Sequence, residues 1–322
     1  MIVPTPSTYR PNLEDFKKAA KRVENVALRT QLIPLRWYDE NPNILLKPEM
    51  LQPIGSYKIR GVYNWVQKLS PEQRAKGIST ASTGNMAQAV AYVARLYNIP
   101  ARATVFTTTP QTKKDAIKKY GAEIATKSRE EMVEYTINPE KDRCFLHPLE
   151  EFGLLDGHGT IGLEIMEDAL ETETIYVPLG AGFLGAGVAL AAKEIKPSVK
   201  IIGVNSENSP HFYEGFKNGK VMNVPIKPTL ADGSAVNLAN FPNTGNLLEL
   251  VIETVDEVVL VSEDEIKNVI RYLALENKLV CEGSSAKSLA AALKTPKDER
   301  GKTVCVLSGG SIGTDKLTSI IS

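Results

Sequence analysis

The chain has 322 residues, of which 43% are hydrophobic and 24% are charged, a balance typical of globular proteins. Lysine plus arginine and aspartate plus glutamate each number 38, so the net charge is zero and nucleic acid is not an expected partner. No apolar stretch reaches the roughly 18 residues of a membrane span, so we expect no membrane association. The three cysteines lack CxxC spacing, which favours reduced thiols and a cytoplasmic protein over a disulfide scaffold.

Amphipathic segments and short apolar runs alternate along almost the whole chain, and they predict helices and strands respectively. The pattern predicts an α/β fold, with a mostly parallel sheet covered by helices on both faces. A ligand then binds beyond the carboxyl ends of the strands. In chain order we expect helices at 12–26 and 86–97 and a strand at 101–107. A helix at 161–170 follows, and then strands at 174–179 and 200–204 that are separated by a helix at 185–195. The last elements are a helix at 263–276, which begins with a capping box of Ser262 and Glu265, and a strand at 303–307.

The length predicts two domains, but no linker rich in Pro, Gly or Ser separates them. We therefore expect one domain to be inserted in the other. The predicted large domain combines residues 1–52 with 150–322, and the predicted small domain is 53–149. The segment 140–159 is rich in turn residues and is the expected crossover.

Lys58 lies in the segment Gly55-Ser56-Tyr57-Lys58-Ile59-Arg60-Gly61, just ahead of a helical pattern. A partly desolvated lysine amine in such a loop becomes nucleophilic and can hold a cofactor. The alternative interpretation is one more solvated lysine.

The segment 81–88 (ASTGNMAQ) places small and polar residues at the start of a helix. Its backbone N–H groups can bind an anion, although Ser82 or Thr83 as an ordinary N-cap explains the pattern equally. The segment 178–187 (PLGAGFLGAG) follows a predicted strand and opens a helix, which is typical of a phosphate-binding loop. Its spacing also fits the dinucleotide fingerprint, but Asn205 replaces the acid expected after the next strand. Tight helix–strand packing remains a third explanation.

Two further loops, 280–286 (VCEGSSA) and 307–311 (LSGGS), have the same character. The histidines at 147, 158 and 211 are scattered, so the sequence predicts no zinc site. It contains neither a P-loop nor a GxSxG nucleophile elbow.

These loops, in this order, resemble the fold-type II pyridoxal phosphate enzymes, in the branch of threonine/serine dehydratases and serine racemases. The matching segments run from about residue 45 to residue 311: LLKPEMLQPIGSYKIRG, ASTGNMAQAVAYVARL, PLGAGFLGAG, TLADGSAV, VVLVSEDEI, CEGSSA and VLSGGS. The resemblance implies a two-domain α/β fold with parallel-rich twisted sheets, pyridoxal 5′-phosphate as cofactor, an amino-acid substrate and a homodimer.

The resemblance also implies a role for each matching residue. Lys58 would form the Schiff base and move the proton at the substrate α-carbon, and Ser308 would meet the pyridine nitrogen. Asn85 would bind the ring hydroxyl, and Gly233 and Glu282 would line the site. The cofactor phosphate would be held by the N–H groups of Gly180, Ala181, Gly182, Phe183 and Leu184, and the substrate carboxylate by Ser82, Thr83, Asn85 and Met86.

A serine hydroxyl is too weak an acid to protonate the pyridine, and an uncharged ring is a weaker electron sink. Ser308 therefore favours prompt loss of a β-hydroxyl, and we expect an L-threonine/L-serine ammonia-lyase that forms 2-oxobutyrate or pyruvate and ammonia. Only 14 residues follow Ser308, so no regulatory domain is expected after it.

This sequence departs from the family pattern at several positions. Met86 replaces the usual histidine, and Thr83 stands where dehydratases often carry alanine and racemases carry serine. Phe183 would be strained in the phosphate loop if its φ had to be positive. Asn205 and His211 replace acids of the branch's metal site, so we expect no metal.

Three other functions stay open. Thr83 can act as the second acid of an amino-acid racemase, and the STGN segment is similar to threonine synthases, which catalyse replacement reactions. A sensor that binds the cofactor or an amino acid without turnover is the non-enzymatic alternative.

Overall fold

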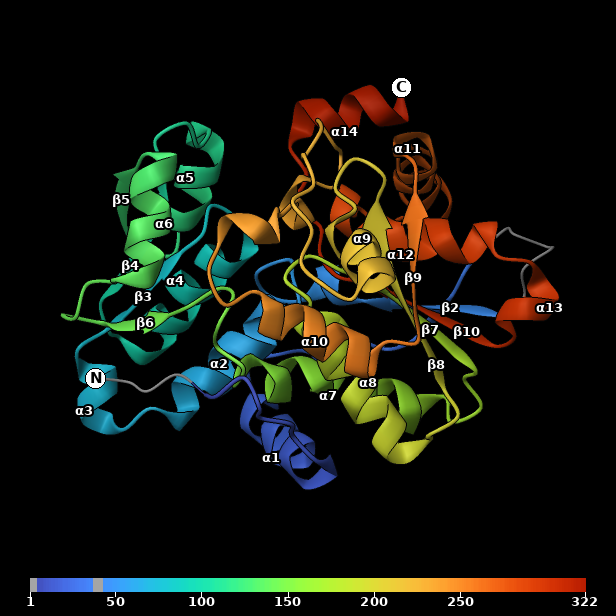
Figure 1. The fold of residues 1–322 in the computed structure, drawn as a ribbon, viewed down its shortest axis with the longest axis horizontal. Coiled ribbons are helices and arrows are strands. Elements are labelled where there is room, and N and C mark those ends of the chain that lie inside the picture. The colour runs from blue at the N-terminus through green and yellow to red at the C-terminus, as the bar shows by residue number, and fades with distance from the viewer. Residues whose placement is uncertain (1–4, 37–42) are drawn as a thin grey trace.

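The computed structural model describes residues 5–36 and 43–322, which form two separate β-sheets (Figure 1). The six-stranded sheet has the order β1-β2-β10-β7-β8-β9, and the four-stranded sheet has the order β5-β4-β3-β6. The strands are β1 (Ile33–Pro34), β2 (Ile44–Pro48), β3 (Ile78–Ala81), β4 (Ala101–Phe106), β5 (Glu123–Lys127), β6 (Cys144–Leu146), β7 (Thr174–Pro178), β8 (Lys200–Ser206), β9 (Glu257–Val261) and β10 (Thr303–Leu307).

Parallel pairing dominates both sheets. Among the strands of the described residues only β1 and β2 form an antiparallel pair, whereas Thr303 of β10 lies beside Ile44 of β2 and beside Thr174 of β7 in parallel register. Parallel strands need crossover connections, which the intervening helices supply. The predicted α/β class with parallel-rich sheets flanked by helices is confirmed.

Helices cover both faces of the larger sheet. Successive side chains of a strand point to opposite faces, so Ile175 and Val177 of β7 enter the core shared with α8, whereas Tyr176 enters the core shared with α12. The helices are α1 (Leu13–Val23), α2 (Lys58–Lys68), α3 (Pro71–Ala75), α4 (Asn85–Tyr97), α5 (Gln111–Lys118), α6 (Arg129–Ile137), α7 (Leu154–Asp168), α8 (Phe183–Ile195), α9 (His211–Asn218), α10 (Gly245–Thr254), α11 (Glu263–Tyr272), α12 (Gly283–Lys294), α13 (Lys297–Arg300) and α14 (Thr314–Ile321).

Short helical turns complete the fold: the 3₁₀ turns η1 (Glu49–Leu51), η2 (Asp232–Ser234) and η3 (Leu238–Asn240), and the π-helical turn η4 (Leu273–Asn277). The predicted capping box of Ser262 and Glu265 begins α11. The segment 140–159, predicted to be a turn-rich crossover, contains β6 at Cys144–Leu146 and the start of α7 at Leu154, so part of it is regular structure and not turn.

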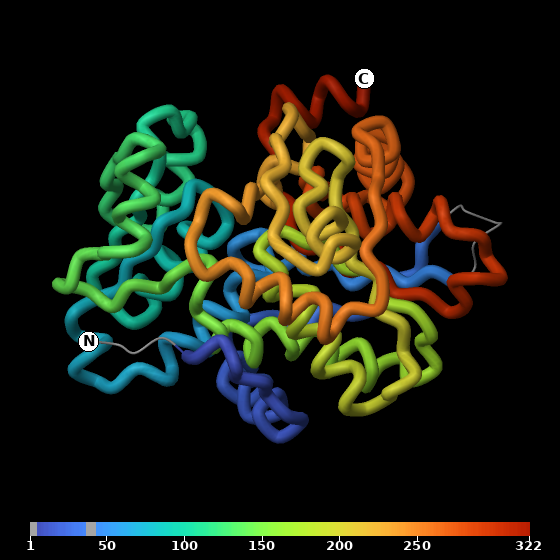
Figure 2. The backbone as a smooth tube through the Cα atoms, viewed as in Figure 1, coloured from blue at the N-terminus to red at the C-terminus, as the bar shows by residue number. Residues whose placement is uncertain are grey.

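The chain order explains how the two sheets are arranged. In Figure 2 the cyan-to-green stretch forms a group on the left, while the yellow-to-red stretches lie together from the centre to the right, with the dark blue helix α1 at the bottom centre. The four-stranded sheet takes its strands from residues 78–146 and the six-stranded sheet from 33–48 and 174–307. One sheet is thus formed entirely within an interruption of the other.

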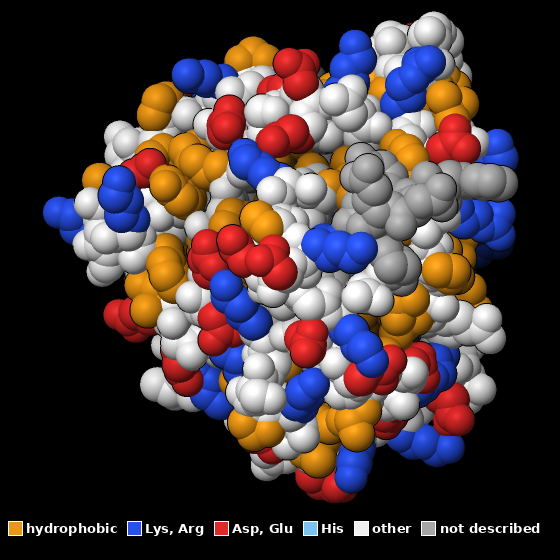
Figure 3. Space-filling model, turned by 90° about the vertical axis from the view of Figure 1, so that its right-hand side faces the viewer, with side chains coloured by type: hydrophobic (Ala, Val, Ile, Leu, Met, Phe, Trp, Pro, Cys, Tyr) orange, Lys and Arg blue, Asp and Glu red, His pale blue; other side chains and the backbone are white. Residues whose placement is uncertain are grey.

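The surface is mixed in charge. On the face in Figure 3, basic and acidic side chains intermingle without a large patch of either sign, in keeping with the net charge of zero. No helix among residues 5–36 and 43–322 has both the length and the hydropathy to cross a membrane.

Candidate active site

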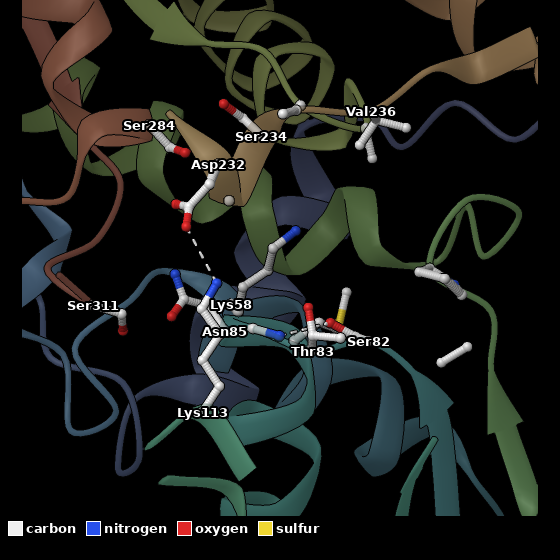
Figure 4. Close-up of a pocket in the computed structure, with 18 of the residues that line it drawn as sticks. Lys58, Ser82, Thr83, Asn85, Lys113, Asp232, Ser234, Val236, Ser284 and Ser311 are labelled. Atoms are coloured by element: carbon white, nitrogen blue, oxygen red, sulfur yellow. Dashed lines mark hydrogen bonds and ion pairs between the residues drawn. The ribbon is translucent and has the colours of Figure 1, made fainter. Parts of the chain in front are cut away.

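A pocket of about 640 Å³ lies where the carboxyl ends of β3, β7 and β10 lead into loops (Figure 4). Parallel strands bring such loops to one edge, which is why segments distant in the sequence meet there. The predicted site residues that line the pocket are Lys58, Ser82, Thr83, Asn85, Met86, Gly180, Ala181, Leu184, Gly233, Glu282 and Ser308. Two predicted residues, Gly182 and Phe183, do not line it.

Lys58 is the first residue of α2. A tight turn precedes it, in which Gly55 has a φ of 71° and its N–H donates to the Gln52 carbonyl at 2.7 Å. The Tyr57 N–H donates to the Ser308 carbonyl at 3.1 Å and so joins the start of α2 to the end of β10. The Lys58 Nζ lies 4.7 Å from the Tyr57 ring centroid and has no hydrogen bond or ion pair within the described residues. The amine is therefore available to a ligand in the pocket.

A buried ionic network supports α2 two residues beyond Lys58. The Arg60 guanidinium is fully buried and donates to both oxygens of Glu49 and of Glu164, at 2.6–3.0 Å. Lys47 Nζ donates to Glu164 at 2.5 Å. Burial alone would raise the pKa of Glu49, but the Arg60 guanidinium holds it below its usual value. The network joins α2 to η1 and α7 and fixes the base of Lys58.

The Ser82–Met86 loop follows β3 and opens α4. Its Ser82 N–H donates to the Thr104 carbonyl at 3.1 Å, which ties the loop to β4. The N–H groups of Thr83, Asn85 and Met86 have no acceptor in the described part of the chain. Unpaired N–H groups at a helix N-terminus attract a carboxylate, both as donors and through the helix dipole.

Asn85 and Glu282 meet across the pocket. Asn85 Nδ2 donates to the two oxygens of Glu282 at 3.0 and 3.2 Å, and the buried Asn85 Oδ1 has no hydrogen-bond partner among the residues that the structure describes. Burial raises the pKa of Glu282 to about 7, against the lowering effect of the Asn85 hydrogen bond. A polar group of a ligand can satisfy the orphaned Asn85 oxygen.

The loop between β7 and α8 has the geometry of an anion cradle. None of its five N–H groups has an acceptor within residues 5–36 and 43–322, and these groups belong to Gly180, Ala181, Gly182, Phe183 and Leu184. The left-handed conformation falls on Gly182, whose φ is 90°, so the expected strain at Phe183 does not arise. Phe183 is the first residue of α8, and its ring turns away to pack at right angles on Phe152, 5.2 Å between centroids.

The residues present fit pyridoxal phosphate. The five free N–H groups suit a phosphate, and the orphaned Asn85 oxygen and the Ser308 hydroxyl supply polar partners for a heterocycle. Glycine at 309 leaves room beside the Asn85–Glu282 pair, because a Cβ there would lie 3.0 Å from Glu282 Oε1 and 3.2 Å from Asn85 Nδ2.

Sequence reasoning missed several residues of this region. Lys113 and Asp232 line the pocket and form an ion pair of 3.3 Å across it (Figure 4). Ser234 and Ser284 also line the pocket, and the buried Lys287 lies behind the loop after β7. A lysine within the run SSAKSLAAAL of small residues was the one available signal for Lys287.

Comparisons with known proteins agree with this geometry. A family model for "Pyridoxal-phosphate dependent enzyme" matches residues 23–309. The L-threonine ammonia-lyase of Thermotoga maritima is 40% identical over an alignment of 318 residues, and the match covers 96% of this chain and 78% of that protein. The catabolic L-threonine dehydratase of Escherichia coli (strain K12) is 35% identical over 323 residues, 96% and 95% of the two chains. The solved structure of maize serine racemase has a TM-score of 0.88 at 30% identity and covers 97% of each chain.

The chain therefore belongs to the pyridoxal-phosphate dependent enzymes of fold type II. Within that family it falls in the branch of threonine dehydratases and serine racemases, and its cofactor is pyridoxal phosphate. The family prediction and the cofactor prediction made from the sequence are confirmed.

Proposed function

We propose that the protein is an L-threonine/L-serine ammonia-lyase that uses pyridoxal phosphate and the amine of Lys58. The observation that carries this proposal is a lysine amine without a hydrogen bond or ion pair among the described residues, in a pocket lined by two loops whose backbone N–H groups also have no acceptor there. Relatives 35–40% identical over 96% of the chain bear the names L-threonine ammonia-lyase and L-threonine dehydratase, which supports the reaction.

The Ser82–Met86 loop binds the substrate carboxylate. The N–H groups of Thr83, Asn85 and Met86 donate to it, and the N-terminus of α4 adds its dipole. The buried Met86 cannot add a charge, so the backbone carries this recognition. The carboxylate fixes the substrate α-carbon within reach of the Lys58 amine.

Lys58 holds the cofactor and then moves the proton at the substrate α-carbon. When bound, pyridoxal phosphate withdraws electrons from that carbon, which makes the proton acidic. Ser308 binds the ring nitrogen through a neutral hydroxyl, which favours loss of the β-hydroxyl over long storage of negative charge. Loss of the α-proton and β-hydroxyl removes water from threonine, and hydrolysis of the resulting enamine returns 2-oxobutyrate and ammonia.

The replacement Lys58→Ala tests the role of this amine. The visible absorbance of the bound cofactor should shift to that of the free aldehyde, and ammonia release from L-threonine should fall by at least about 1,000-fold, as for loss of a covalent catalyst. Lys76→Ala, which removes an exposed lysine, is the control. An unchanged visible spectrum in Lys58→Ala would show that another group holds the cofactor.

Thr83 supports a second candidate function, amino-acid racemisation. Its hydroxyl lines the same pocket as Lys58, and a racemase needs a second proton donor. The likeness to maize serine racemase supports this alternative as well.

The domain boundaries, the oligomeric state and the location of the protein are part of the same proposal. We infer a large domain of residues 1–52 and 150–322, a small domain of 53–149, a homodimer and a cytoplasmic location. The separate four-stranded sheet within residues 78–146 supports the domain boundaries, and sedimentation equilibrium tests the dimer.

A further inference from the structure

The carbonyl groups of the phosphate loop are tied back into the protein. The Leu179 carbonyl accepts hydrogen bonds from Lys287 Nζ at 2.8 Å and from Asn205 Nδ2 at 3.2 Å. The Gly180 carbonyl pairs with His211 Nε2 at 2.8 Å. Both carbonyls thus accept hydrogen bonds from side chains outside the loop, and the N–H groups of residues 180–184 have no acceptor among the described residues and remain available to a ligand.

Asn205 and His211 therefore have a role that differs from metal binding. Asn205 Oδ1 also accepts the N–H groups of Phe212 and Tyr213 at 2.9 and 3.1 Å, so this one amide joins the loop to the first turn of α9. His211 is buried, and burial lowers its pKa to about 4, so it holds Gly180 as a neutral donor. Neither residue brings a charge to the loop.

Lys287 is the cation behind this loop. It lies in α12, is 1% exposed, and donates to two neutral acceptors, the Leu179 carbonyl at 2.8 Å and the Ser234 hydroxyl at 2.9 Å. No carboxylate forms an ion pair with it in the described part of the chain. Glu263 and Glu282 are the carboxylates that act on it from a distance, and His211 is the other titratable neighbour.

A buried ammonium without a counter-ion is costly, since both burial and the missing partner oppose the charged form. Burial lowers the pKa of Lys287 to about 7. A phosphate dianion bound to the N–H groups of residues 180–184 would supply the missing negative charge from the other side of the loop. The small residues around it in α12 leave room for the lysine but give it no other charged partner.

We propose that Lys287 is the positive charge of the cofactor phosphate site and acts through the loop it holds, as a positioning residue with an electrostatic role. This inference rests on the proposed role of residues 180–184 in binding the phosphate and is independent of the reaction catalysed. Ser234 lines the pocket (Figure 4) and accepts from Lys287, so it connects the buried amine to the pocket.

The test compares pyridoxamine 5′-phosphate with pyridoxamine. The two differ only in the phosphate, and neither forms a covalent bond with Lys58. Binding of each to the full chain, freed of cofactor, is measured by fluorescence for the wild type, Lys287→Met, Lys287→Gln and Lys294→Gln. Lys287→Gln keeps a neutral donor for the Leu179 carbonyl, and Lys294→Gln removes an exposed charge from the same helix.

We expect the phosphate to increase the affinity of the wild type and of Lys294→Gln by the same factor. In Lys287→Met and Lys287→Gln this factor should fall about 10- to 100-fold, as for loss of a charged hydrogen-bonding partner, with the affinity for pyridoxamine unchanged. The ³¹P resonance of the holoenzyme at pH 7 should move toward the monoanion position in both variants, because a lost cation raises the second phosphate pKa.

Three results would contradict either the proposed phosphate loop or the proposed charge of Lys287, and the measurements distinguish these results from one another. A wild type that gains nothing from the phosphate contradicts the proposed phosphate loop itself. A Lys287→Gln variant with the wild-type phosphate factor and ³¹P shift contradicts the charge and leaves Lys287 as a structural donor. Equal losses for both ligands in Lys287→Met and Lys287→Gln, with lowered melting temperatures, also contradict the proposal, because they indicate a general loss of folding.

Discussion

At the scale of single residues, the position of a hydroxyl distinguishes the candidate reactions. Ser308 follows β10 and is 5% exposed, and Thr83 follows β3, so two hydroxyls line the pocket from different sheets. The Ser308 hydroxyl is proposed to bind the ring nitrogen, which leaves Thr83 as the residue that separates elimination from racemisation. Its removal therefore tests one function without abolishing the other.

Thr83→Val keeps the branched shape and removes the hydroxyl. We expect 2-oxobutyrate formation from L-threonine to stay within about 10-fold of the wild type, because backbone N–H groups hold the carboxylate. Any conversion of L-serine to D-serine, followed by chiral chromatography, should fall by about 100-fold or more, as for loss of a general acid. A Thr83→Val enzyme that loses deamination to the same extent would contradict this division of roles.

Sequence reasoning identified the residues that face the pocket better than those behind it. Gly180 and Ser308 were found because a small-residue loop after a strand is a pattern with a physical meaning. Lys287 was missed because a helical lysine is ordinarily solvated, and burial is visible only in the structure. The strain considered at Phe183 did not arise, because a sequence does not show which residue of a loop takes the positive φ.

At the scale of elements, the position of Lys58 depends on how α2 packs on α7. Gly157 of α7 faces the backbone of α2, where an added Cβ would overlap the Arg60 carbonyl and lie 2.7 Å from the Gly61 Cα. Gly157 and Gly159 also explain why the sequence predicted a turn-rich segment at 140–159. Glycine disfavours isolated helices, and close packing accounts for both glycines within α7: Gly157 lies against the backbone of α2, whereas Gly159 lies against the Phe16 ring of α1 and the Gly187 carbonyl of α8.

Gly157→Ala should push α2 away from α7. We expect the protein to lose about 1–3 kcal/mol of stability, as in overpacked cores, and to bind the cofactor less tightly. Gly245→Ala is the matched control, because nothing lies within 4 Å of the Cβ it would add in α10. Urea unfolding followed by tryptophan fluorescence makes the comparison, and equal midpoints for the two variants would contradict the packing argument.

Glu49→Gln tests the ionic network that joins η1, α2 and α7. Because the folded pKa of Glu49 lies below its usual value, its contribution to stability is present above the unfolded pKa and is lost as the pH falls through the folded pKa. The variant should lose about 3 kcal/mol at pH 7, as for one broken buried ion pair, and should show a weaker loss of stability on acidification. Urea midpoints measured from pH 7 down through the acidic range well below pH 4 check both, and a parallel pH dependence for variant and wild type over that whole range would exclude Glu49 as the titrating group.

At the scale of the whole molecule, the pocket lies between elements of two sheets. The Ser82–Met86 loop belongs to the four-stranded sheet, and residues 180–184 and Ser308 belong to the six-stranded one. The alternation of helices and strands was sufficient to predict an α/β fold. The order of the strands was not predictable, because it depends on long-range pairing such as that of β10 between β2 and β7.

This arrangement predicts that substrate binding draws the two sheets together. A substrate carboxylate held by the Ser82–Met86 loop would connect the smaller sheet to Lys58 and the larger one, and the Lys113–Asp232 ion pair already spans the pocket. Small-angle X-ray scattering should show a smaller radius of gyration when an unreactive threonine analogue is added to the holoenzyme. An unchanged radius at saturating analogue would exclude closure of this size.

The most direct test of the central claim is proton NMR of the holoenzyme with L-threonine and L-serine in heavy water. We expect 2-oxobutyrate and pyruvate to accumulate with the wild type, and both products to be absent with Lys58→Ala. Deuterium at the α-carbon without any oxo acid would contradict the ammonia-lyase, because it would show that the proton is removed while the hydroxyl stays.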